Sequence, residues 1–330
     1  MSRIPRRVAI GMVALLAAAM PLVGCKPRGT EPVFSGEVKV AVSFPALYSL
    51  AANVVGDTGT VKSVKSTQGA HGSEVTAAER QVVESADVLF INGLGLDDEF
   101  AQKLRKTSAN PNVKLVLLGN LLDRKSLLDS SGCACCAHGH EGGHDHADHP
   151  HDPHVWTGID RAVAMVDTIA DELGQSYPAH KDTFRRNADA YKAKLTALKK
   201  EGLEALAGGS KADRKIVTAH GSMGYFADTF GLTVVDTIQK TAGSEPGKKE
   251  LDELIQKCKK EGVRVIASEP QFSKMGVVKT LADELNRTGH PVTVIELDNL
   301  EVATDTELKP DLYETKMRAN VAALKGVFGK

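Results

Sequence analysis

Hydrophobic residues along this chain follow two periods, one typical of strands and one of helices. Short apolar runs in the first half predict strands at residues 38–43, 87–92 and 113–118, and alternation predicts another at residues 60–65. Apolar positions at helical spacing predict helices over residues 45–54 and 76–85, the first of which opens at Pro45. Strands that alternate with helices form a mostly parallel sheet covered by helices. The first half is therefore expected to be an α/β unit.

The same alternation returns in the second half of the chain. Strands are predicted at residues 215–219, 233–236, 263–268 and 291–297, and helices at residues 248–261, 277–286 and 311–328. The middle of the chain carries two helical patterns, at residues 158–173 and from Pro178 to the Gly208-Gly209 pair. The second is long enough to be a rigid strut, although its pattern fits one more surface helix equally well.

We therefore predict an α/β fold with two similar lobes, each with a mostly parallel sheet, joined by a long helix. The expected boundaries are residues 37–175 for the first lobe, 176–210 for the linking helix and 211–330 for the second lobe. A chain of this length has room for two lobes with their own cores.

The N-terminus carries the features of an export signal and a lipid attachment site. Basic residues precede an apolar run at residues 8–23, which is too short and wrongly flanked for a membrane-spanning helix. The sequence Leu-Val-Gly-Cys that follows resembles the bacterial lipobox, in which the cysteine is lipidated and becomes the mature N-terminus. We expect a signal peptide at residues 1–24, a lipidated Cys25 and a tether at residues 25–36. A plain secretory signal cut elsewhere is the alternative.

These features predict an exported lipoprotein that is anchored in a membrane and faces the periplasm or the cell exterior. Loss of the signal removes three of the 41 basic residues and none of the 42 acidic ones, so the mature charge is 38 − 42 = −4. No stretch is basic enough to indicate a nucleic-acid partner.

A loop at residues 133–151 concentrates metal-binding side chains. It is rich in glycine, lacks apolar periodicity and cannot bury enough surface to order itself. Imidazole and thiolate are ligands that zinc and copper prefer, so we expect auxiliary metal capture there; a low-complexity insertion without a role is the alternative. The side chains expected to capture metal are Cys133, Cys135, Cys136, His138, His140, His144, His146, His149 and His151.

The cysteines allow a second interpretation of the same loop. In an oxidising compartment a disulfide is as good an account of the three clustered cysteines, with Cys133 to Cys136 the more plausible pair. Cys258 lies within a predicted amphipathic helix and is interpreted as a small buried hydrophobic residue.

Four further side chains outside this loop predict a built metal site. In open parallel sheets, ligands bind beyond the carboxyl ends of the strands. His71, His220 and Asp298 each follow a predicted strand, and His154 lies in the segment that leads into the next helix. Three imidazoles and one carboxylate suit a tetrahedral ion in a cleft between the lobes. Glu269 also ends a strand of the second lobe and is the alternative fourth ligand.

Several motifs together resemble the zinc/manganese solute-binding lipoproteins of bacterial ABC importers, the cluster A-I family. They are the lipobox, His71 after a glycine loop, the histidine-rich loop, Asp152-Pro-His-Val-Trp156, Thr218-Ala-His-Gly-Ser-Met-Gly-Tyr225 and Ser268-Glu-Pro-Gln-Phe272. The resemblance implies two α/β lobes joined by a long helix, with the ion held between them and handed to a membrane permease. It implies ligand roles for His71, His154 and His220, with an acidic fourth ligand that best matches Asp298. We also expect the protein to be a monomer.

Zinc is the expected ion and manganese the alternative, because the affinity order places zinc above manganese at such a site. Copper competes with zinc for such sites, and the thiols of the loop favour Cu(I). We expect a zinc receptor and not an enzyme, since a closed site with four ligands leaves no position for an activated water and the sequence has no nucleophile elbow. A membrane-anchored zinc buffer that uses the loop is the alternative function, and a zinc hydrolase is the less favoured one.

Overall fold

A computed structural model describes residues 32–65, 67, 69, 71, 74–130, 151–208, 210–240, 244–272 and 276–328. The expected signal peptide, the lipidation site at Cys25 and the cysteines and histidines of the loop other than His151 lie outside these residues. Among the helices described here, none is both long and apolar enough to cross a membrane.

The first lobe is built on a parallel sheet with the strand order β2-β1-β3-β4. Its strands are β1 (Val38–Val42), β2 (Gly59–Ser63), β3 (Val88–Ile91) and β4 (Lys114–Leu117). Its helices are α1 (Pro45–Val55), α2 (Ala77–Glu84) and α3 (Asp98–Thr107). The four predicted strands of this half are confirmed, and α3 is a helix that the sequence pattern did not predict.

The second lobe repeats this arrangement with the strand order β6-β5-β7-β8, again entirely parallel. Its strands are β5 (Lys215–Thr218), β6 (Thr233–Thr237), β7 (Val265–Ser268) and β8 (Thr293–Glu296). Its helices are α6 (Gly224–Phe230), α7 (Lys248–Glu261), α8 (Gly276–Arg287) and α9 (Leu312–Phe328). The equivalent strand order confirms the prediction of two similar α/β lobes.

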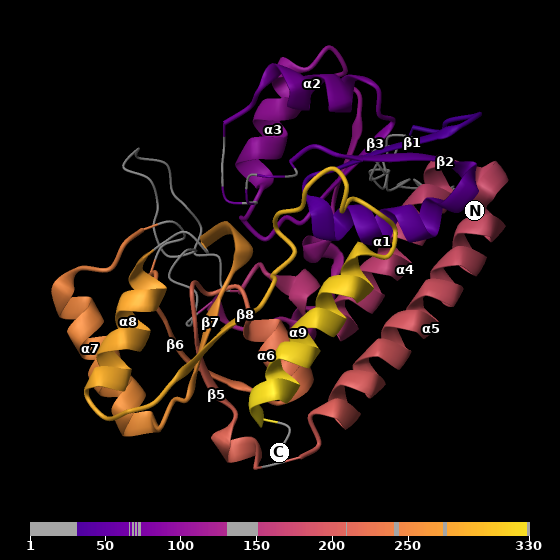
Figure 1. Cartoon of the computed structure of the whole chain (residues 1–330). Coiled ribbons are helices and arrows are strands. Elements are labelled where there is room, and N and C mark those ends of the chain that lie inside the picture. Colours follow the sequence, from indigo (N-terminus) through magenta and orange to yellow (C-terminus); the bar gives the residue numbers. More distant parts are fainter. Residues whose placement is uncertain are drawn as a thin grey trace, which may run out of the picture. The chain divides into compact units, whose positions relative to one another are not determined.

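Two long helices separate the strands of the first sheet from those of the second along the sequence. They are α4 (Ile159–Ser176) and α5 (Lys181–Ala205), which pack against each other. Helix α5 also packs against α1 of the first lobe and against α6 and α9 of the second (Figure 1). It therefore contacts both lobes along its length, as the predicted strut requires.

Alternation of side chains along the strands decides which core each residue joins. In β1, Val40 and Val42 face one core, whereas Ala41 faces a separate cluster with residues of α2 and α3. In β7, Val265 joins the first core and Ile266 joins a cluster with residues of α7 and α8. The inner faces of both sheets thus share one continuous core with α4, α5 and α9. Cys258 is fully buried in the outer cluster of the second lobe, which confirms its interpretation as a core residue.

Candidate metal centre

Four side chains able to bind a metal converge at the carboxyl ends of the strands. His71 lies in the loop after β2, His220 follows β5, and Glu301 follows β8. His154 directly precedes a 3-10 helix (Val155–Thr157) that leads into α4. Because parallel strands end at the same edge of a sheet, residues far apart in the sequence meet there. Three side chains are essentially buried, and the fourth, His71, is 24% exposed.

The spacing of these side chains fits a tetrahedral ion. Their ligand atoms all lie within 4.8 Å of one another. His71 Nε2 is 3.3 Å from His154 Nε2 and 3.4 Å from Glu301 Oε1. Glu301 Oε1 is 3.5 Å from His220 Nε2 and 3.8 Å from His154 Nε2. Donors at zinc–ligand bond lengths around a tetrahedral ion lie roughly 3.4 Å apart, so an ion fits without a large rearrangement.

Two atoms of this group are buried without a hydrogen-bond partner in the described part of the chain. They are the Nε2 of His220 and the Oε1 of Glu301. Burying such atoms unsatisfied is costly, and native proteins rarely do so without a bound group. A cation between the two atoms would satisfy both.

Carboxylates hold two of the histidines in the orientation that a metal requires. Asp152 Oδ1 lies 2.9 Å from the backbone N of His154 and 2.8 Å from its Nδ1. Glu269 Oε1 holds His220 in the same way, at 3.2 Å from its backbone N and 2.9 Å from its Nδ1. A proton on Nδ1 leaves Nε2 of each ring available to the ion, which is how outer carboxylates support metal-bound histidines.

Opposite charges hold these side chains together. Burial disfavours charge on the His220 ring, but the carboxylates of Glu269 and Glu301 outweigh it and raise its pKa to about 10. Burial also disfavours charge on Glu301, but His71 and His220 outweigh it and hold the pKa of Glu301 well below its usual range. A proton on His220 Nε2 therefore points to the place of the metal and must leave when the ion binds.

The structure does not bring the expected fourth ligand, Asp298, into this group. Asp298 Oδ1 accepts a hydrogen bond from the backbone N of Leu300 at 2.8 Å, and its Oδ2 lies 3.0 Å from Lys316 Nζ. Its carboxylate is thus engaged by its own turn and by α9, and Glu301 takes the place expected for it. Glu269, the alternative, is hydrogen-bonded to the Nδ1 of His220 and does not belong to the four-residue group.

Sequence reasoning missed Glu301 because it favoured the first carboxylate after the strand. A signal was present in the Asp298-Asn299 pair, since Asp followed by Asn forms turns by bonding its own backbone. The next carboxylate along the loop, Glu301, is then left free for a ligand role. His151, the one residue of the expected capture set that is described, pairs through a β-bridge with Asp129 and does not belong to the four-residue group.

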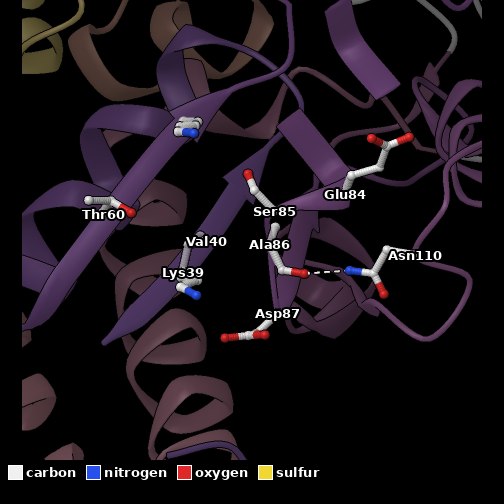
Figure 2. Close-up of a pocket in the computed structure, with 9 residues that line it drawn as sticks. Lys39, Val40, Thr60, Glu84, Ser85, Ala86, Asp87 and Asn110 are labelled. Carbon is white, nitrogen blue, oxygen red and sulfur yellow. Dashed lines mark hydrogen bonds between the residues drawn. The ribbon is translucent and has the colours of Figure 1, made fainter. Parts of the chain in front are cut away.

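A surface hollow of about 300 Å³ lies at the opposite edge of the first sheet (Figure 2). It is formed by the amino ends of β1 and β2, where Lys39 and Thr60 lie, and by the segment before β3. Figure 2 shows Asn110 donating a hydrogen bond to the carbonyl oxygen of Ala86, at 2.7 Å. The described residues that line the hollow include no histidine or cysteine. It is therefore separate from the metal centre.

Two α/β lobes of equal strand order, with three histidines and a glutamate gathered at their strand ends, define a two-lobed metal-binding protein. The chain belongs to the ZnuA family, described as zinc-uptake complex component A, periplasmic, whose profile matches residues 40–327. This family consists of solute-binding receptors and not of enzymes.

Relatives and solved structures agree with this assignment. The zinc-binding lipoprotein AdcA of Streptococcus pneumoniae serotype 4 is 30% identical over 96% of this chain and 60% of its own length. The structure of the Zn(II)-bound ZnuA-like domain of AdcA from the same species is 27% identical with a TM-score of 0.67, and the match covers 89% of this chain and 100% of that one. The solute-binding protein FpvC of Pseudomonas aeruginosa in complex with Mn²⁺ is 26% identical with a TM-score of 0.73, over 89% and 98% of the two chains. The chain spans about 57–60% of the length of the AdcA relatives that it matches.

Proposed function

We propose that this protein is a receptor that binds one zinc ion through His71, His154, His220 and Glu301 and delivers it to an ABC importer permease. The four ligand atoms carry this proposal, because they lie within 4.8 Å of one another at the spacing of donors around a tetrahedral ion. Membership of a zinc-uptake family supports it.

Zinc is the ion that the donor set favours. Three imidazoles and one carboxylate offer borderline-soft nitrogen ligands, and the affinity order places zinc above manganese at such a site. AdcA is named a zinc-binding protein, which supports zinc, whereas the FpvC complex with Mn²⁺ keeps manganese as the alternative cargo.

The location and partners follow from the N-terminal sequence and from the family. We propose a monomeric lipoprotein, anchored through Cys25 and facing the periplasm or the cell exterior. The family's description as a periplasmic uptake component and the name lipoprotein of AdcA support this location. The expected lobe boundaries at residues 37–175, 176–210 and 211–330 remain part of the proposal.

The decisive experiment measures zinc stoichiometry and affinity in a variant whose residues 131–150 are replaced by a short glycine-serine linker. We expect one tightly bound ion, because the four proposed ligands lie outside the replaced segment. Glu301→Gln in this background should weaken zinc binding by more than about 100-fold. The loss of a metal ligand should reduce affinity more than the loss of a residue that only orients a ligand. Asp298→Asn, the matched control, keeps an oxygen for the backbone of Leu300 and should cost less than about 10-fold.

The alternative function is a zinc buffer in which the loop is the binding site. Seven histidines at residues 138–154, six of them before Asp152, support it from the sequence. It predicts several weak ions in the intact protein and no tight ion in the linker variant. That pair of results would replace the receptor proposal.

A further inference from the structure

One buried residue, which binds no metal itself, is hydrogen-bonded to a proposed ligand and to two residues that contact other proposed ligands. We infer that Asn299 is a positioning residue, which holds Glu301, His220 and His154 in the arrangement that zinc requires. The inference rests on the proposed function, and it concerns how the affinity of that site is set.

Each polar group of Asn299 that reaches towards the site has a partner. Its Oδ1 accepts a hydrogen bond from the backbone N of Glu301 at 3.2 Å, and its Nδ2 donates to Glu269 Oε2 at 2.9 Å. Its backbone oxygen accepts a hydrogen bond from Trp156 Nε1 at 2.6 Å. The residue is fully buried, so water does not compete for these bonds.

These bonds lead directly to the ligands. Glu301 is itself the proposed carboxylate ligand, so the Oδ1 bond fixes the backbone that carries it. Glu269 pairs with the Nδ1 of His220, at 2.8 Å through the same Oε2 that Asn299 contacts. Trp156 lies beside His154, with ring centroids 5.3 Å apart. The side chain of Asn299 thus reaches two ligands, and its backbone reaches the support of a third.

The turn that carries Asn299 is held from both lobes. Leu300 has a φ of 61°, a left-handed conformation that non-glycine residues rarely adopt, and such conformations persist only when the surroundings impose them. Its carbonyl oxygen accepts a hydrogen bond from the backbone N of Ala46 in α1, at 3.2 Å. On the other side, Asn320 of α9 bonds both the N and the O of Asp298, each at 2.8 Å.

The chemistry of the position requires an amide. One end must donate to the Glu269 carboxylate, and the other must accept from a backbone N–H. An aspartate would keep the acceptor but would place a second carboxylate against Glu269, where like charges repel. Asn299→Asp therefore removes the donor to Glu269 and leaves the bond to Glu301 possible.

The test compares Asn299→Asp with Asn320→Asp in the otherwise intact protein. Asn320 is also buried and also makes two hydrogen bonds to this turn, but it bonds only the backbone of Asp298, so it is the matched control. The readouts are zinc affinity by chelator competition, the visible absorption of bound Co²⁺, which reports the ligand geometry, and the melting temperature of the metal-free protein.

We expect Asn299→Asp to weaken zinc binding by about 10- to 100-fold, the range for outer partners of metal ligands, and to change the Co²⁺ spectrum. Asn320→Asp should lower the melting temperature by a comparable amount, with a zinc affinity and a Co²⁺ spectrum like those of the wild type. If Asn299→Asp does not fold, Asn299→Ser removes the same donor without adding charge and should give the same loss.

Two kinds of result would overturn the inference, and only the second would also overturn the receptor proposal. Wild-type zinc affinity and an unchanged Co²⁺ spectrum in a folded Asn299 variant, or equal effects of both substitutions, would make Asn299 merely structural while the receptor proposal stands. A wild-type protein that binds neither zinc nor Co²⁺ tightly would overturn the receptor proposal and the positioning role together.

Discussion

Lowering the pH from 9 to 7 should weaken zinc binding about 100-fold through one proton on His220. The pKa of this buried histidine is raised to about 10, because the attraction of Glu269 and Glu301 outweighs the effect of burial. Zinc requires the unprotonated Nε2, so each unit of pH below the pKa lowers the apparent affinity about tenfold, and two units give about 100-fold. Zinc binding at pH 7.5 should therefore release about one proton.

Two assays measure this linkage. Chelator competition at pH 7, 8 and 9, corrected for the protonation of the chelator, gives the slope of log affinity against pH. Calorimetry in buffers of different ionisation enthalpy counts the protons released. A slope near zero over this range, together with binding heats that are equal in all buffers, would refute a protonated His220 in the metal-free site.

The stability of the metal-free protein should change with pH in the opposite direction to the zinc affinity, which provides a second check. The pKa of His220 is higher in the folded protein than its ordinary value of 6.5, so the folded state binds this proton more tightly than the unfolded state does. Its stabilising contribution is fully present below pH 6.5 and is lost as the pH rises through about 10. Thermal melts from pH 7 to 10 should show the metal-free protein losing this contribution while the affinity for zinc rises.

Three further predictions concern stability and reactivity. Thr76→Ala removes a capping box with Glu79 at the start of α2 and should destabilise the protein by about 1 kcal/mol in urea unfolding; an unchanged midpoint would contradict the role of the cap. Gly202→Ala should destabilise it by about 1–3 kcal/mol, because a Cβ there would lie 2.4 Å from a ring carbon of Phe230; a higher melting temperature would show that the helical preference of alanine wins. Burial raises the pKa of the Cys258 thiol to about 11, so this thiol should resist alkylation at pH 8 until denaturant is added, and mass spectrometry would detect any earlier labelling.

The chain's own periodicity was sufficient to predict most of the fold. All eight described strands overlap the segments predicted for them. The apolar run is clearest in β3, which is buried at every position, and weakest in the edge strands β2 and β8, whose positions are all exposed or half-buried. Helices α3 and α6 were not predicted. Helix α6 has only seven residues, from which a period is hard to recognise, whereas α3 was missed although Phe100, Ala101 and Leu104 have helical spacing. His71 and His220 were predicted from strand ends, because the carboxyl edge of a parallel sheet is where ligands bind, and His154 from the segment that leads into the next helix.

The fourth member of the site was decided only by the tertiary structure. Whether Asp298 or Glu301 points to the three histidines depends on Lys316, which α9 brings to Asp298, and on the left-handed conformation of Leu300 between them. The turn at Asp298-Asn299 left a local signal, but the contact with Lys316 comes from a helix far along the chain, and no rule about residues that follow strands detects it. The sequence determined which side chains could bind an ion, and the packing of the last helix and the turn before it determined which carboxylate is free to do so.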